Sequence, residues 1–226
     1  LQHPYQTSWG VSTRLVGMII MAHGDDKGLK LPPKLAPHQI VIVPIIPNDK
    51  DKESVMTVVN QLNDSLSEFR VIIDDRSEVS PGFKFNEWEQ KGVPLRVEVG
   101  PKDIEKNTIL VSRRDDESKN SYPMDDVQNT IKKLLDEIQD NLYKNSENTL
   151  KENTTHVESF SELIEVLNSK KGFVSCFWKE NKEDELKIKE ETSATLRCYP
   201  LENTDSEKAV NSDSENGNFA IFSKAY

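Results

Sequence analysis

The first residues that could do chemistry are a serine and an arginine at the start of an apolar segment. Ser12 precedes the run TRLVGMIIMAHG, in which Arg14 is the second residue. A helix N-terminus presents free amides and the positive end of the helix dipole, and an arginine adds a bidentate charged donor. This pattern indicates a phosphate site at Arg14. A salt-bridged surface arginine is the alternative that the spacing leaves open.

A second polar group, HGDD at residues 23–26, directly follows the apolar run. A histidine beside two aspartates suits metal binding or acid–base chemistry. No second histidine lies close in the sequence to complete a ligand set. A polar turn that closes the helix is therefore the favoured interpretation.

The two cysteines, Cys176 and Cys198, form the third candidate group. They fit neither a disulfide framework nor a complete zinc site, because a structural zinc ion takes four ligands. Their number is typical of a protein from a reducing, cytoplasmic compartment.

The elements that carry these groups begin with a helix between Ser12, its expected N-cap, and Gly24, its expected stop. Apolar residues run nearly all round this helix, which predicts that it is buried. A buried strand is the competing assignment, because Val16, Ile19 and Ile20 are β-formers. The proline-rich segment KLPPKLAPH that follows predicts irregular structure and a domain boundary.

Strands and helices then alternate as far as Tyr143, which predicts an α/β fold with a mixed sheet flanked by helices. In VPLRVEVG, Leu95, Val97 and Val99 share one face, whereas Arg96 and Glu98 share the other. The expected strands are QIVIVPII, RVIIDD, VPLRVEVG and NTILVSRR, and the expected helices are DKESVMTVVNQLNDSLSEF, PGFKFNEWEQKG and DDVQNTIKKLLDEIQDNLYKNS.

The chain turns more polar after Lys144, and a small α+β domain is expected there. Helix is predicted to continue through NSENTLKENTTHVESFSELIEVLNSKKG. The segments FVSCFW and ATLRCYP predict strands on either side of a charged helix, KEDELKIKEET. A turn-rich loop, ENTDSEKAVNSDSENGN, leads to the last expected strand, FAIFSKAY.

The charge balance limits the possible partners. A net charge of −10, most of it in the last third of the chain, argues against a nonspecific coat for nucleic acid but permits a local basic patch. No segment reaches the ~20 apolar residues needed to span a bilayer, so a membrane is not an expected partner.

Long motifs of this sequence resemble the class II aminoacyl-tRNA synthetases, specifically prolyl-tRNA synthetases of the archaeal and eukaryote-like type. TSWGVSTRLVGMIIMAHGDDKGLKLPPKLAPHQIVIVPI looks like the third class-defining motif, and DDRSEVSPGFKFNEWEQKGVPLRVEVGPKDIE looks like the anticodon-binding domain. KEETSATLRCYP and FSKAY continue the likeness. The resemblance implies three parts: the end of a catalytic domain (1–37), an anticodon-binding domain (38–143) and a C-terminal prolyl-tRNA synthetase domain (144–226).

The resemblance also implies an activity, proline–tRNA ligase. ATP and proline would give prolyl-adenylate, and the prolyl group would pass to the tRNA. Arg14 matches the family's arginine on the γ-phosphate of ATP, and Ser12 matches a residue near the nucleotide. Mg²⁺ would accompany ATP in a full-length, cytoplasmic homodimer. The other two class motifs do not occur in this sequence, so the chain alone is expected to be inactive.

For the anticodon, the resemblance implies contacts from Glu89, Arg96, Lys102 and Asp103. Proline anticodons end in two guanines, and a guanine offers N7 and O6 acceptors beside an N1/N2 donor edge. Two cations and two carboxylates match that inventory.

Two neighbouring groups leave alternatives open. The aromatic residues Phe83, Phe85 and Trp88 could stack on bases, although core packing is favoured by their helical spacing. The cations Arg113, Arg114 and Lys119 could hold phosphates or belong to a solvated charge cluster with the following DDE.

Zinc is not expected, although many relatives carry four cysteines near the C-terminus. Cys176 matches the first of these, and the other three positions lack a cysteine. Cys176 is therefore expected to be a small buried hydrophobe. The resemblance further implies that the terminal Tyr226 reaches back toward the catalytic domain.

Two other functions remain open. One is a freestanding tRNA-binding module without catalysis, which would not need Arg14 or HGDD. The other is a protein-interaction role for the acidic C-terminal third.

Overall fold

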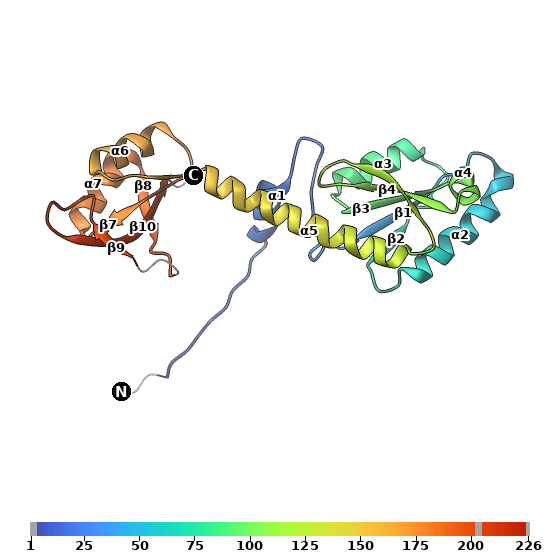
Figure 1. Ribbon diagram of the computed structural model, residues 1–226, viewed down its shortest axis with the longest axis horizontal. Coiled ribbons are helices and arrows are strands. Elements are labelled where there is room, and N and C mark those ends of the chain that lie inside the picture. Colours follow the sequence, from blue (N-terminus) through green and yellow to red (C-terminus); the bar gives the residue numbers. More distant parts are fainter. Residues whose placement is uncertain (1–3, 202–204, 225–226) are drawn as a thin grey trace. The chain divides into compact units, whose positions relative to one another are not determined.

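The computed structural model describes residues 4–201 and 205–224 and divides into two compact units, Leu1–Ser146 and Glu147–Tyr226 (Figure 1). The division falls within the long helix α5 (Val127–Glu152). The proposed position of Tyr226 lies outside the described residues.

The described part of the first unit is built on a mixed sheet with the strand order β2-β1-β3-β4-β5. Strand β1 pairs in parallel with β2 and β3, and β3-β4-β5 pair antiparallel. This arrangement confirms the predicted α/β fold with a mixed sheet. The strands are β1 (Ile40–Pro44), β2 (Val71–Ile73), β3 (Leu95–Val99), β4 (Thr108–Arg113) and β5 (Lys119–Pro123).

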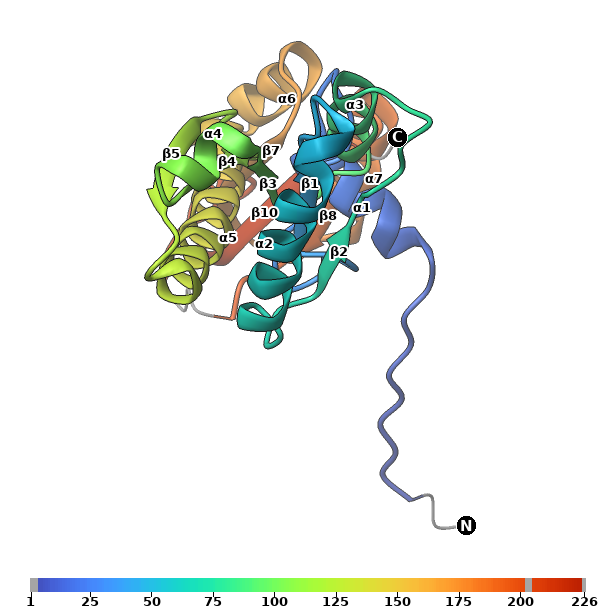
Figure 2. The same cartoon turned by 90° about the vertical axis from the view of Figure 1, so that its right-hand side faces the viewer.

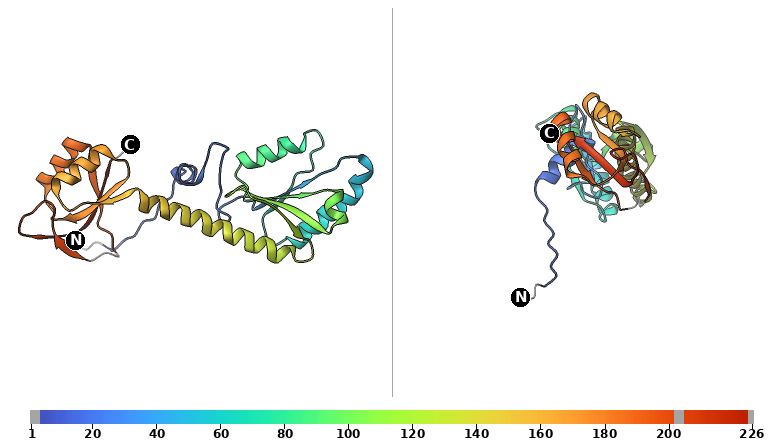
Figure 3. Two further views of the ribbon diagram at one scale, coloured as in Figure 1. Left: turned by 45° about the horizontal axis from the view of Figure 1, so that its top comes forward. Right: turned by 90° about the vertical axis from the view of Figure 1, so that its left-hand side faces the viewer.

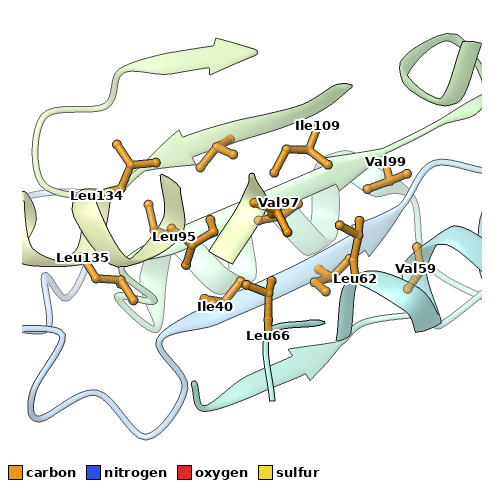
Figure 4. Close-up of a cluster of buried hydrophobic side chains, with 14 of the residues drawn as sticks. Ile40, Val59, Leu62, Leu66, Leu95, Val97, Val99, Ile109, Leu134 and Leu135 are labelled. Atoms are coloured by element: carbon orange, nitrogen blue, oxygen red, sulfur yellow. The ribbon is translucent and has the colours of Figure 1, made fainter. Parts of the chain in front are cut away.

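The larger core of this unit lies on one face of the sheet (Figure 4). Ile40, Leu95 and Ile109 of the sheet pack there against side chains from α2 (Lys52–Ser65) and α5, among them Leu62 and Leu134 (Figure 4). Both helices cover the same face of the sheet (Figure 2). The short helix η1 (Asp49–Asp51) leads into α2. The apolar periodicity of both long segments thus correctly predicts helices that cover this face.

The opposite face of the sheet is covered by helix α3 (Pro81–Gln90), which begins at the N-cap Ser80. Trp88 of α3 packs against Val41 and Val43 of β1. On the neighbouring strand β3, the same face carries Arg96 and Glu98, as the alternation predicts. A short helix, α4 (Pro101–Glu105), follows β3.

Helix α1 (Arg14–His23) forms as predicted, and the competing strand assignment is wrong. Two details differ from expectation. The N-cap is Thr13 rather than Ser12, and none of the ten residues is buried. The apolar side chains of Leu15, Met18 and Met21 are exposed, because no element in the described part of the chain covers them.

The described part of the second unit holds a sheet with the order β6-β7-β10-β8, and β9 pairs with the start of β10. Trp178, Phe222 and Ile188 lie in its core. The two helices of this unit lie together on one side of the sheet (Figure 3). This is the expected small α+β domain. The elements are β6 (Thr154–His156), α6 (Phe160–Ser169), β7 (Phe173–Trp178), α7 (Lys182–Thr192), β8 (Ala194–Cys198), β9 (Ser206–Lys208) and β10 (Asn216–Lys224).

The prediction of continuous helix through residues 145–172 is wrong. Strand β6 interrupts it, and a new helix starts after the N-cap Ser159, whose hydroxyl accepts a hydrogen bond from Glu162 N. Consecutive β-branched residues at Thr154 and Thr155 favour the strand, where Thr155 pairs with Val174. The expected loop before β10 likewise contains β9.

Candidate functional site

A hollow of about 170 Å³ lies where α3, β3, β4 and the β4–β5 turn meet in the first unit. Its lining is strongly charged. The lining residues are Glu89, Val93, Arg96, Ser112, Arg113, Arg114, Glu117 and Lys119. The hollow therefore brings together Glu89 and Arg96, two of the four residues expected to read an anticodon.

Arg96 is held by a network around the buried carboxylate of Glu98, which is 5% exposed. Arg96 Nε donates to Glu98 Oε1 at 3.2 Å, and Arg96 Nη2 donates to Ser112 Oγ at 3.3 Å. Lys119 Nζ donates to Glu98 Oε2 at 2.9 Å. The guanidinium carbon of Arg96 lies 4.3 Å from the centre of the Phe85 ring. The Arg96 side chain is therefore held both by this ring and by its hydrogen bonds to Glu98 and Ser112.

Helix α3 is anchored by Asp74, which follows strand β2. Its carboxylate accepts two hydrogen bonds from Arg76, at 2.8 and 2.7 Å, and one from Trp88 Nε1 at 2.8 Å. Lys84 Nζ donates to the Asp74 carbonyl at 3.0 Å. The hydrogen bonds from Arg76 and then Trp88 lower the pKa of Asp74 to about 2, although burial acts in the opposite direction. An ionised Asp74 therefore sets the position of α3.

The three aromatic residues of α3 occupy different environments. Trp88 is buried in the core, as favoured by its spacing. Phe85 lies beneath Arg96, and Phe83 is exposed, so core packing is wrong for Phe83.

Glu89 lies at the end of α3, where its backbone is tied to the segment after α1. Arg114, 5% exposed, donates from Nε to the Glu89 carbonyl at 3.0 Å. The same guanidinium binds both oxygens of Asp25, at 2.9 and 2.6 Å. These hydrogen bonds hold the pKa of the Asp25 carboxyl far below its usual value. The HGDD segment is thus a polar turn, as favoured, and its first aspartate is an anchor.

Further contacts fasten the segment 25–31 to the corner between α3 and β3. Leu29 N donates to Gln90 O at 3.0 Å, and Leu31 N donates to Gly92 O at 3.2 Å. Gly28 has φ +136°, and a Cβ at this position would lie 2.5 Å from Gln90 Cα. Only glycine fits this approach. We call residues 25–31 the strap.

Two of the three cations proposed for phosphate binding are already neutralised. Arg113 makes a bidentate pair with Asp115 and also binds Glu137, while Arg114 binds Asp25. They belong to a charge cluster rather than to a phosphate site. The Lys119 side chain is 43% exposed and remains accessible.

Lys102 and Asp103 do not line the hollow, because they lie on α4 beyond the end of β3. Asp103 Oδ2 accepts a hydrogen bond from Gly100 N at 2.9 Å and so caps the helix. Lys102 is exposed. The structure therefore separates the four expected residues into two pairs.

Ser12 and Arg14 lie together at the start of α1, where Arg14 N donates to Ser12 Oγ at 3.4 Å. Both residues are exposed. In the described part of the chain no carboxylate lies within 4.0 Å of the Arg14 guanidinium.

The two cysteines differ in their surroundings. Cys176 is buried on β7, and burial raises the pKa of its thiol to about 12, whereas Cys198 is exposed. Across residues 4–201 and 205–224, no three His, Cys, Asp or Glu side chains cluster in a way that could hold a metal ion. A zinc-free domain stays a prediction.

No helix in the described part of the chain combines the length and the apolar character that crossing a bilayer requires.

Two family models match the chain. Residues 39–134 match the anticodon binding domain, and residues 160–226 match the C-terminal domain of prolyl-tRNA synthetase. The fold of the first unit and these matches thus identify an anticodon-binding domain of an aminoacyl-tRNA synthetase.

Curated relatives and a solved structure agree with these matches. The proline–tRNA ligase of Alkaliphilus oremlandii (strain OhILAs) is 49% identical over 203 residues, which are 89% of this chain and 42% of the relative. That of Roseiflexus sp. (strain RS-1) is 44% identical over 231 residues, with 100% and 48% covered. The prolyl-tRNA synthetase of Cryptosporidium parvum, solved in complex with L-proline and AMP, is 37% identical with a TM-score of 0.84, covering 95% of this chain and 46% of that one.

The chain belongs to the prolyl-tRNA synthetase family and corresponds to its C-terminal part. It spans about half the length of the relatives that it matches.

Proposed function

We propose that this chain is the anticodon-reading part of a proline–tRNA ligase, which attaches proline to its tRNA at the expense of ATP. The observation that carries the proposal is the charged hollow at Glu89 and Arg96, inside the residues that match the anticodon binding domain. Such a hollow, open at the surface and lined by fixed charges, suits a base that has been splayed out of a single-stranded loop.

The chemistry of the lining suits a guanine. The Glu89 carboxylate can accept from the N1 and N2 donors, and Arg96 can donate to O6 and N7. Two nitrogens of Arg96 are used by Glu98 and Ser112. Within the described residues Nη1 has no partner, so this nitrogen is the donor that we assign to the base.

Lys102 and Asp103 are proposed to contact the second guanine. The Asp103 cap uses Oδ2, which leaves Oδ1 to accept from a base. Lys102, exposed on the first turn of α4, supplies the matching donor. Two separate pairs of residues would then read two adjacent guanines.

The remaining assignments follow from the family. Residues 1–37 would close the catalytic domain, with Ser12 and Arg14 on the wall of the ATP site and Mg²⁺ bound with ATP in the whole enzyme. Residues 38–143 would be the anticodon-binding domain, and residues 144–226 a zinc-free C-terminal domain. The whole enzyme would be a cytoplasmic homodimer, and this chain alone would not activate proline.

Binding of RNA to this chain tests the proposal. An RNA stem-loop with a proline anticodon should bind more tightly than one in which both guanines are replaced by adenine. Arg96→Lys keeps the charge but loses the planar donor fork, and it should reduce this preference by about 1–3 kcal/mol. Lys133→Ala on α5, whose side chain is 79% exposed, is the control and should leave the preference unchanged.

Two results would count against the proposal. If the unchanged chain binds both RNAs equally, it does not read the anticodon. If Arg96→Lys keeps the full preference for the guanine RNA, Arg96 does not contact the anticodon.

A further inference from the structure

The charges around the hollow divide into two sets of opposite sign. After the pairs Arg113–Asp115 and Arg114–Asp25 are set aside, Arg96 and Lys119 remain with one carboxylate between them, Glu98. At the other end, Glu89 and Glu117 share one cation: Lys27 lies 4.0 Å from Glu89 and pairs directly with Glu117. One end of the hollow thus carries excess positive charge, and the other end carries excess negative charge.

Lys119 is fixed at the positive end by three features of the fold. Strand β5 pairs Lys119 with Ser112, which is paired in turn with Arg96. Its Nζ binds Glu98 Oε2, and it lies 5.6 Å from the centre of the Phe85 ring, above which Arg96 also lies. The two cations are therefore side by side on one carboxylate and one aromatic ring.

The two oxygens of Glu98 have separate tasks. Oε1 accepts from Arg96 and Ser112, and Oε2 accepts from Lys119. A glutamine that keeps its oxygen toward Arg96 presents an NH₂ group to Lys119. Two donors then face each other, and Lys119 loses its anchor.

We infer that Lys119 is a further RNA-binding residue of this site and that Glu98 is a positioning residue that holds it beside Arg96. Its ligand is an acceptor atom of the RNA, either guanine O6 or N7 or an oxygen of the neighbouring phosphate. The inference rests on the proposed function, since it adds one residue to the same hollow. It also makes the hollow bipolar, with a donor end at Lys119 and an acceptor end at Glu89.

The test compares Lys119→Ala, Glu98→Gln and the double variant, each in the whole 226-residue chain. The probes are the proline-anticodon stem-loop and its adenine-substituted form, titrated at several KCl concentrations. Each single variant should weaken binding of the guanine RNA about tenfold. The double variant should be no weaker than either single variant, because Glu98→Gln acts by releasing Lys119.

The two sources of the acceptor give different results. If Lys119 binds the base, the preference for guanine over adenine falls about tenfold and the salt dependence stays. If it binds phosphate, both RNAs weaken alike and the slope of log K against log salt falls by about one. The indole proton signal of Trp88 by NMR confirms in each variant that α3 keeps its place.

The inference fails if Lys119→Ala matches the unchanged chain in affinity, preference and salt slope. It fails for Glu98 if the two single effects add in the double variant. Neither failure affects the proposed function while the unchanged chain still prefers the guanine RNA. A chain without that preference would refute the proposed function, and the inference with it.

Discussion

Asp74→Asn is the most direct test of how the site is held in place. The Asp74 side chain is 2% exposed and binds Arg76 and Trp88, which lowers its pKa from 3.8 to about 2. Each unit by which a pKa differs between the unfolded and folded states corresponds to about 1.4 kcal/mol. The ionised carboxylate therefore contributes about 2 kcal/mol to the free energy of unfolding, and asparagine should lose most of it.

The pH dependence of this loss has a definite sign. The carboxyl has the lower pKa in the folded protein, so its contribution is fully present above the unfolded value of 3.8 and is lost as the pH falls through about 2. At pH 3 roughly half of the contribution should remain. The difference in stability between the unchanged chain and Asp74→Asn should therefore shrink steadily below pH 4.

Urea unfolding followed through the indole proton of Trp88 by NMR measures this difference. The chain has three tryptophans, so the signal can be assigned, and Trp88 donates directly to Asp74. Asp75→Asn is the matched control, because Asp75 is adjacent and exposed, and it should be nearly neutral. A difference for Asp74→Asn below about 0.5 kcal/mol at pH 7, or one that does not change with pH, would refute the reasoning.

Two further predictions concern the strap and the cysteines. Gly28→Ala should destabilise the first unit by more than about 1 kcal/mol in urea unfolding, because the added Cβ would meet Gln90. The control Gly82→Ala has open space in helix α3 and should be neutral or stabilising by up to about 1 kcal/mol. Equal unfolding midpoints for both variants would contradict the Gly28–Gln90 contact. With a disulfide reagent at pH 8, the exposed Cys198 should react quickly, whereas Cys176 should react only on unfolding. The Cys176 thiol has a pKa of about 12, so roughly one molecule in ten thousand is ionised at pH 8. Two thiols that react at one rate in the folded chain would contradict this prediction.

Much of the fold could be predicted, because the first unit repeats simple patterns. The continuous apolar run Ile40–Pro44 became a strand buried along its whole length. The alternation in Leu95–Val99 placed Arg96 and Glu98 on one face of the sheet. Both are local properties of the chain, and local patterns are what a sequence displays most directly.

The contacts that hold the proposed site had no such signal. The sequence names Lys119 only as one of three cations that could hold phosphates or belong to a charge cluster, because its edge strand β5, KNSYP, shows no apolar alternation that would place it beside Arg96. The Asp25–Arg114 pair joins residues 89 positions apart, which no local pattern indicates. The exposure of α1 was also missed, because an apolar helix predicts burial but does not name what covers it.

The strap connects the hollow to helix α1 through an equilibrium that can be observed directly. The amides of Leu29 and Leu31 are held by Gln90 and Gly92, so their protons exchange with solvent only when the strap lifts from this corner. A ligand that stabilises the corner must slow that exchange. Thermodynamic reciprocity then requires that closure of the strap strengthen binding of the ligand by the same free energy. Hydrogen exchange at the amides of Leu29 and Leu31 therefore measures the coupling free energy between ligand binding in the hollow and closure of the strap that follows α1.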